Sequence, residues 1–468
     1  MNLWIPATFF IALHTPAWAE DQPSEPAKDT YTLAMDIYTS AQDSEVKPSL
    51  VVEAPVQAAP PMIEAPKLSR EDNAALHLSI LRDEVDNMTQ VGFFGSLFSE
   101  NEELQQALMQ DIELFLAIYS DLPITSEAML LKGQMLAKQN HPEAAVVAWL
   151  QTMYEFPKSD TSLKARRSIL DTIKSDWDDE ADVVEGIIKH VPSKDIASRL
   201  RSLINQLYPI NDQDIVQALT LLQLDFLKRF SDDPHADEVQ ILLAHNMGAE
   251  SAESGIFGFR KLLTLYPESS YRAEAMLAIA DLQRLRLKAY QKAADNYKVL
   301  IAQYPEHKLA KLAYENLALT QAEHLKSYPE AIATNQKIVE LYPEDKVSLK
   351  ALQNIAKLQR SKTDEPEQAI ATLRKLATMF HGFEAPEALH DAIKIAEKKL
   401  KNEKLAFEIR QQLVNDYPQS DEAPEALFDM AEYAEQSGDA AQAKALYTKL
   451  INQYPSEKSL VRKARERI

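Results

Sequence analysis

The sequence predicts an all-α fold, an α-solenoid of helix pairs with a period of about 37 residues. The chain has 468 residues but only 9 glycines, whereas tight β-hairpin turns need glycine or asparagine at positive φ. A position that usually holds proline returns at intervals of 37, 35, 39, 36, 38, 38, 38, 37 and 37 residues: Ser120, Pro157, Pro192, Ser231, Pro267, Pro305, Pro343, His381, Pro418 and Pro455. Fixed periods between about 20 and 50 residues are typical of solenoids, in which each unit buries its apolar face against its neighbours.

Residues around this proline position define a pair of helices. Small residues lie twelve places before it: Ala145, Gly255, Ala293, Ala331, Ala369, Ala406 and Ala443. Bulky residues lie eight places before it: Trp149, Phe259, Tyr297, Leu373 and Tyr447. Small residues also lie thirteen places after it: Gly133, Ala244, Ala280, Ala318, Ala356 and Ala431. Small residues at fixed places on two successive helices allow the helices to approach closely, and the bulky residue fills the groove between them.

This pattern resembles the tetratricopeptide repeat (TPR) family, over about residues 69–468 and most clearly from Gly255 onward. The family repeat is about 34 residues long and this one is longer by about three. The resemblance implies a right-handed α-solenoid that binds proteins. The long repeat with its "YP" pair is similar to that of bacterial envelope proteins, including the periplasmic partner of the Tol-Pal system and the lipoprotein of the barrel-assembly machinery.

The recurring Tyr-Pro pair predicts the end of the second helix in each pair. Proline lacks a backbone donor, disfavours helix in the residue before it, and favours the start of the next helix. We expect the tyrosine to pack in the seam between repeats with its hydroxyl at the wet edge.

The chain divides into five predicted parts. Residues 1–19 are predicted to be a cleavable signal peptide, because an apolar run is followed by Ala17-Trp18-Ala19; the alternative is an uncleaved anchor. Residues 20–67 are predicted to form a linker rich in proline and alanine. Residues 68–118 are expected to form an N-terminal helical segment and cap. Residues 119–230 are divergent repeats, with the weakest register at 171–230, and residues 231–468 are regular repeats that end in a capping helix.

Composition limits the chemistry. The formal net charge of −21 disfavours nucleic-acid binding, and the absence of cysteine excludes disulfides, thiolate zinc sites and a cysteine-linked lipid anchor. No hydrolase, P-loop or dinucleotide motif is present, so we expect no enzyme activity and no cofactor. His381 and His390 with the glutamates between them form a weak metal pattern, which we interpret as ordinary surface residues.

Two groups of residues are candidates for binding a partner. Phe93, Phe94, Leu97 and Phe98 form an aromatic cluster that either docks a partner or covers the open face of the first repeat. In the TPR family the first helix of each pair lines the concave groove, which places Lys350, Gln353, Lys357 and Arg360 there as a basic row. Such a row suits a partner's carboxylates. The alternative is a solvated helix face, because the flanking residues Glu315, Leu319, Asp391 and Ile395 have no common sign of charge.

These observations favour a non-enzymatic periplasmic scaffold that binds protein partners of the cell envelope through acidic or C-terminal segments. The resemblance supplies the envelope role, whereas the periodicity supplies only the scaffold. The alternative is a non-catalytic TPR subunit of a complex for polysaccharide synthesis or secretion, or for peptidoglycan remodelling.

Overall fold

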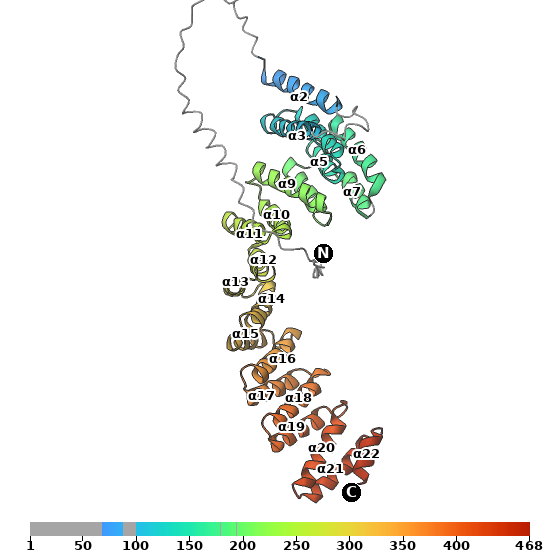
Figure 1. Ribbon diagram of the computed structural model, residues 1–468, viewed down its shortest axis with the longest axis vertical. Helices are drawn as coiled ribbons and strands as arrows, with labels where there is room; N and C mark the ends of the chain where they lie inside the picture. The colour runs from blue at the N-terminus through green and yellow to red at the C-terminus, as the bar shows by residue number, and fades with distance from the viewer. Residues whose placement is uncertain (1–67, 88–99, 178, 193) are drawn as a thin grey trace, which may run out of the picture. The chain divides into compact units, whose positions relative to one another are not determined.

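The computed structural model describes residues 68–87, 100–177, 179–192 and 194–468. These ranges contain α-helices joined by short turns and no β-strand (Figure 1). The helices are α2 (Arg70–Asn87), α3 (Glu100–Ile118), α4 (Thr125–Lys138), α5 (Pro142–Glu155), α6 (Asp160–Asp176), α7 (Asp179–Lys189), α8 (Ile196–Leu207), α9 (Gln213–Arg229), α10 (Ala236–Glu250), α11 (Ala252–Leu265), α12 (Arg272–Leu285), α13 (Tyr290–Gln303), α14 (Lys308–Leu319), continued by the π-helix η2 (Thr320–His324), α15 (Tyr328–Leu341), α16 (Lys346–Ser361), α17 (Pro366–Met379), α18 (Glu384–Lys398), α19 (Glu403–Asp416), α20 (Ala423–Gln436), α21 (Ala440–Gln453) and α22 (Lys458–Arg465). The predicted all-α solenoid of helix pairs is confirmed. None of the described helices is long and apolar enough to cross a membrane.

Helices α10 to α22 form the regular repeats. The second helices of successive pairs, α11, α13, α15, α17, α19 and α21, begin 38, 38, 38, 37 and 37 residues apart. In this part of the chain each helix packs mainly against the helix before it and the helix after it. The buried core is therefore built repeat by repeat.

The Tyr-Pro pair ends the second helix of a pair, as predicted. Tyr304, Tyr342 and Tyr417 each cap such a helix, and the carbonyl of each accepts a hydrogen bond from the amide three residues on (3.1, 3.0 and 3.1 Å). Proline is thus the second residue of a β-turn, a position that its fixed φ favours. The expectation that it would start the next helix is wrong, since α14 begins three residues after Pro305. Tyr454 is almost buried, and its hydroxyl donates to the Pro418 carbonyl of the preceding turn (2.8 Å).

The small residues at the two predicted places are buried between helices. A Cβ atom on Gly255 would clash with the backbone of Gly248, so α10 and α11 touch at their glycines. A Cβ atom on Gly133 would clash with the Trp149 ring in the same way. Ala318 and Ala356 are only 4% and 5% exposed. The helix faces were therefore predicted correctly at these positions.

Turns within the regular pairs share a feature that the sequence did not reveal. From the pair α12–α13 to the pair α20–α21, each such turn contains one residue in the left-handed region, with φ between 50° and 83°: Lys288, Lys326, Asp364, Lys401 and Gly438. A polar pair also joins the two helices of several repeats, where the buried glutamines Gln283, Gln321 and Gln359 accept hydrogen bonds from Asn296, Thr334 and Thr372. These contacts fix the register of each helix pair.

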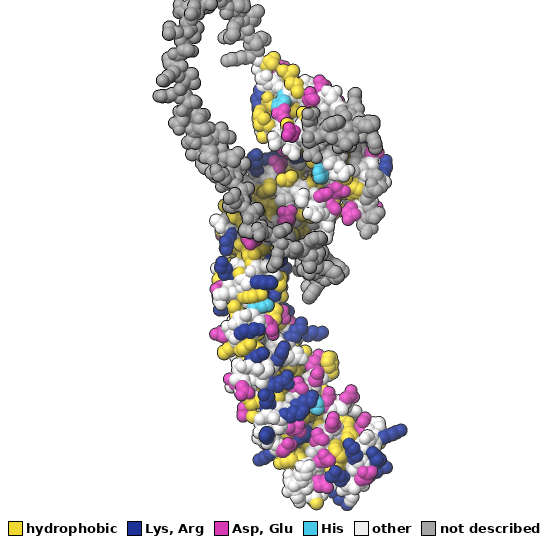
Figure 2. All heavy atoms as spheres, in the orientation of Figure 1, with side chains coloured by type: hydrophobic (Ala, Val, Ile, Leu, Met, Phe, Trp, Pro, Cys, Tyr) yellow, Lys and Arg dark blue, Asp and Glu magenta, His cyan; other side chains and the backbone are white. Residues whose placement is uncertain are grey.

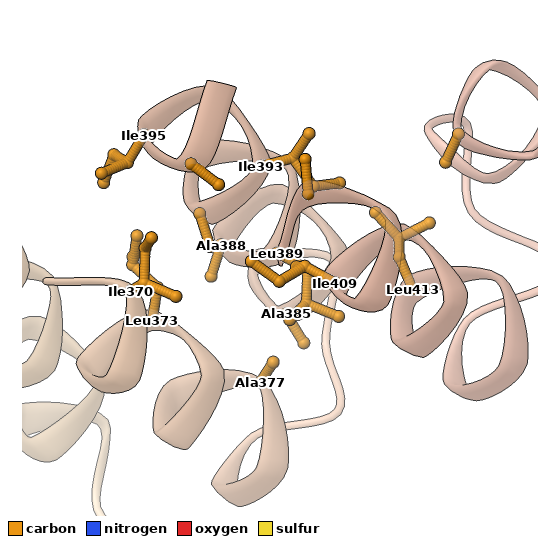
Figure 3. Close-up of a cluster of buried hydrophobic side chains, with 14 of the residues drawn as sticks. Ile370, Leu373, Ala377, Ala385, Ala388, Leu389, Ile393, Ile395, Ile409 and Leu413 are labelled. Carbon is orange, nitrogen blue, oxygen red and sulfur yellow. The ribbon is translucent and has the colours of Figure 1, made fainter. Parts of the chain in front are cut away.

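Aliphatic side chains fill the space between neighbouring repeats. Figure 3 shows Leu389 of α18 close to Ile409 of α19, with Ile370 and Leu373 of α17 on the other side. All four are buried. At the C-terminal end α22 buries Val461 and Ala464 and carries Arg462, Lys463 and Arg465 in its last turn.

The N-terminal helix α2 buries the apolar seam that its spacing predicts, namely Ala74, Leu78, Leu81 and Val85. It packs on α3 and α4, and Lys138 of α4 donates to the Val85 carbonyl (2.5 Å).

The divergent segment is helical but packed irregularly, as its weak register suggests. Here α5 contacts α6, α8 and α9, so that a helix four places further along the chain returns to it. Tyr208-Pro209, which falls out of phase in the sequence, follows the end of α8 and precedes α9. The contact between α5 and α9 has no equivalent among the regular repeats.

Candidate partner-binding grooves

The predicted basic row lies on the solvent-facing side of α16. Lys350, Gln353, Lys357 and Arg360 are all exposed, whereas Ala351, Leu352, Ile355 and Ala356 on the other side of the helix are buried. The amphipathic phase of α16 is therefore as expected.

Two of these four residues line a groove between α14, α15 and α16. The groove consists of two adjoining hollows of about 270 and 80 Å³, which share Leu319, Asn335 and Asn354. Lys350 lines the larger hollow and Lys357 the smaller one. Gln353 and Arg360 are on the same helix but do not line it, and the Arg360 guanidinium lies 3.9 Å from the Asp391 carboxylate.

The groove is basic. Its lining contains Lys326, Lys350, Lys357 and Lys362 but only two carboxylates, those of Glu315 and Glu323. Within the described part of the chain neither Lys350 nor Lys357 takes part in an ion pair. Because the protein as a whole is acidic, this excess of positive charge is local, and Figure 2 shows acidic and basic side chains intermixed over the regular repeats.

One residue that we placed on the groove next to this row is not there. Ile395 of α18 is only 2% exposed. The buried face of α18 repeats that of α16 after 37 residues, since Ala351, Leu352 and Ile355 correspond to Ala388, Leu389 and Ala392. The step from Pro343 to His381 predicted a repeat of 38 residues instead. An error of one residue rotates the predicted helix face by about 100°, which is why Ile395 was placed on the wrong side.

The aromatic candidates Phe93, Phe94, Leu97 and Phe98 lie outside the described residues. Their proposed role stays a prediction.

A larger cleft, which the sequence did not reveal, lies between α3, α4, α5 and α9. Its volume is about 560 Å³. Aliphatic side chains form much of its wall: Leu116, Met129, Leu136, Val147, Ala148, Ala218, Leu221 and Leu222. The cleft exists because α9 returns to α5, a contact between distant segments that no local pattern predicts.

Charged side chains meet at one end of this cleft. Arg229 of α9 donates to both carboxylate oxygens of Glu155 on α5 (2.8 Å each) and to Asp225 Oδ2 (2.9 Å), while Gln151 donates to Glu155 Oε1 (2.9 Å). Burial works against the charge of Arg229, but its hydrogen bonds to Glu155 and Asp225 outweigh burial and raise the pKa of the guanidinium. Two carboxylates thus share one cation.

No group of three or more histidine, aspartate and glutamate side chains in the described ranges could hold a metal ion. Both grooves offer side chains suited to recognition by charge and apolar contact.

Two segments of the chain, residues 274–307 and 425–456, match the family model for the tetratricopeptide repeat. They cover α12–α13 and α20–α21, two of the helix pairs described above. These two matches support a relation to the tetratricopeptide repeat family.

Solved structures similar to this chain include several repeat proteins. A tetratricopeptide repeat protein from Parabacteroides merdae ATCC 43184 is 13% identical over 57% of this chain and 98% of its own, with a TM-score of 0.32. PilW, a widely conserved type IV pilus biogenesis factor, is 19% identical over 50% of this chain and 100% of its own, with a TM-score of 0.29. The TPR domain of P58(IPK) is 15% identical over 78% of this chain and 99% of its own, with a TM-score of 0.23. No curated protein matches the sequence significantly.

Proposed function

We propose that this chain is an exported, non-enzymatic scaffold that binds acidic segments of partner proteins and coordinates a complex of the bacterial cell envelope. The observation that carries the binding role is the groove between α14, α15 and α16, where four lysines face two glutamates. An acidic segment would form charge-assisted hydrogen bonds with Lys350 and Lys357. The envelope role rests on the long "YP" repeat and on the signal-like pattern before Glu20.

The binding role is tested with a fluorescein-labelled peptide of alternating glutamate and leucine and its lysine–leucine counterpart. We expect the acidic peptide to bind with the higher affinity. Its affinity should fall as the salt concentration rises, because charge pairs at a surface are screened within about 10 Å at 0.1 M. The double variant Lys350→Glu/Lys357→Glu should lower its affinity at least about tenfold, which corresponds to ~1.4 kcal/mol.

A matched control variant reverses the charge of two exposed lysines that lie outside the groove. Lys298 of α13 and Lys449 of α21 are exposed lysines on second helices and line neither hollow. The variant Lys298→Glu/Lys449→Glu should bind the acidic peptide within about twofold of the unmodified protein. Equal losses in the two double variants would show that net charge, and not this groove, attracts the peptide.

Export is tested by mass spectrometry of the mature N-terminus. The pattern Ala17-Trp18-Ala19 predicts cleavage before Glu20 and recovery from the periplasmic fraction. A chain that still begins at Met1 in the membrane fraction would contradict the proposed location.

A further inference from the structure

We propose that the cleft between α3, α4, α5 and α9 is a second docking site, which binds an apolar segment of a partner protein that carries a lysine or arginine. This proposal goes beyond the acidic-segment groove, because the two sites lie on different helices and prefer opposite charges.

A whole face of α9 lines the cleft. The lining residues of this helix recur at helical spacing: Asp214, Gln217, Ala218, Leu221, Leu222, Asp225, Lys228 and Arg229. Asp214 and Arg229 are separated by fifteen residues of sequence, or about 22 Å along the helix axis. This length suits a stretch of polypeptide.

The wall of the cleft offers apolar contact to such a segment. Val147, Ala148 and Leu222 form a buried floor, with 3%, 7% and 2% of their surfaces exposed. Leu221 also lines the cleft and is 63% exposed, so its side chain is accessible to an occupant. Cavities of about 300–1,000 Å³ with mainly apolar walls and a few polar groups are typical of binding sites.

The charged end of the cleft determines which sign of charge the bound segment should carry. Glu155 and Asp225 share the single guanidinium of Arg229, which leaves about one negative charge without a counter-ion. Asp225 is 37% exposed at its side chain and uses only Oδ2 in its contacts with Arg229 and Gln151. Its Oδ1 is therefore available to a donor on the occupant.

The remaining charges of the lining do not reverse this preference. Lys132 forms an ion pair with Glu113 (2.5 Å), and the other two groups, Lys228 and Asp214, are of opposite sign. The lining as a whole holds four carboxylates and three cations. An ammonium or guanidinium group on the bound segment would balance the charges of the lining, whereas a further carboxylate would be repelled.

The test uses two labelled peptides that differ in one residue, fluorescein-Leu-Ala-Leu-Leu-Lys-amide and the same peptide ending in glutamate. Binding to the full chain is followed by fluorescence anisotropy. We expect the lysine peptide to bind at least about tenfold more tightly than the glutamate peptide, a difference of ~1.4 kcal/mol. The variant Asp225→Asn should reduce this preference, with binding of a norleucine-terminated peptide unchanged.

Two leucines on α9 provide a matched pair of variants. Leu221 lines the cleft, while Leu224 on the same helix is 45% exposed and does not line it. Leu221→Glu should lower the affinity for the lysine peptide at least about tenfold, and Leu224→Glu should change this affinity less than about twofold. The variant Lys350→Glu/Lys357→Glu should bind the lysine peptide like the unmodified protein, so failure at one site is distinguishable from failure at the other.

Melting temperatures within a few degrees of the unmodified protein show that the variants are folded. Equal affinity for the lysine and glutamate peptides, or equal effects of Leu221→Glu and Leu224→Glu, would overturn the proposal. Self-association that sedimentation detects and that Leu221→Glu abolishes would also overturn it, since the occupant would then be a second copy of this chain.

Discussion

The regular repeats α10–α22 and the divergent segment α4–α9 use the same helix-pair unit in different ways. In the regular repeats each helix packs mainly on its chain neighbours, and the proposed site for acidic segments is the groove between α14, α15 and α16. In the divergent segment α9 packs on α5, and a larger cleft lies between α3, α4, α5 and α9. Loss of the regular register thus creates a site that a uniform solenoid does not provide.

The largest effect is expected when the ion pair that links α5 to α9 is removed, because this contact holds the divergent segment in its irregular packing. Glu155→Ala leaves the Arg229 guanidinium without its two shortest contacts in a partly buried place. We expect a loss of about 2–3 kcal/mol in the free energy of unfolding, below the 3–5 kcal/mol typical of fully buried pairs because Arg229 keeps some contact with water. Urea denaturation measures the loss.

The comparison for this change is Lys189→Ala, which removes an exposed ion pair with Glu185 on α7. It should cost less than about 0.5 kcal/mol. Equal losses in the two variants would mean that the link between α5 and α9 does not stabilise the divergent segment.

A second prediction concerns the seams of the regular repeats. Ala318→Leu or Ala356→Leu overpacks a buried contact between helices and should cost about 1–3 kcal/mol in the free energy of unfolding. Lys350→Ala or Lys357→Ala changes an exposed position and should cost less than about 0.5 kcal/mol. Denaturant melts in which the lysine variants lose as much as the alanine variants would contradict the assigned helix faces.

A third prediction tests the left-handed turn residues. Lys326 has φ of 57°, a conformation in which glycine avoids the clash of a side chain, so Lys326→Gly should stabilise the protein by about 0.5–1 kcal/mol. Gly438 has φ of 83° at the corresponding turn, and Gly438→Ala should destabilise by about 1 kcal/mol. Thermal melts of the two variants should shift in opposite directions; shifts in the same direction would refute the turn geometry.

The smallest effect is expected at high pH. The pKa of the Tyr447 phenol is raised to about 12, above its ordinary value of about 10. The main cause is burial, and the second is the hydrogen bond that the hydroxyl donates to Glu435 Oε2 (3.1 Å). Since the folded protein holds this proton more tightly than the unfolded chain, its contribution is present below about pH 10 and is lost as the pH rises through about 12. Tyr447→Phe should flatten this decline in urea melts, and an unchanged slope would exclude Tyr447 as its source.

The sequence contained enough to predict the helix pairs, because small, bulky and proline residues recur at fixed distances. It also predicted the solvent-facing side of α16, since buried and exposed residues alternate there with helical period. It failed at Ile395, where a one-residue change of period is invisible from the proline positions alone. The left-handed lysines carry no sequence signal, because lysine is common in every kind of exposed segment.

The cleft could not be predicted for a different reason. Leu221 and Glu155 belong to helices that local patterns place far apart, and only the packing of α9 on α5 brings them together. The polar and charged residues Gln151, Glu155, Asp225 and Arg229 look like ordinary surface positions in the sequence. Their relation depends on a contact between distant segments that a single sequence does not specify.

The most direct test of the two-site account is hydrogen–deuterium exchange of the full chain with each peptide in turn. The acidic peptide should slow exchange in α14–α16, and the lysine-ended peptide should slow it in α5 and α9, because bound segments suppress local opening. Two separate regions of protection are expected. Protection of the same region by both peptides, or protection in neither, would contradict it.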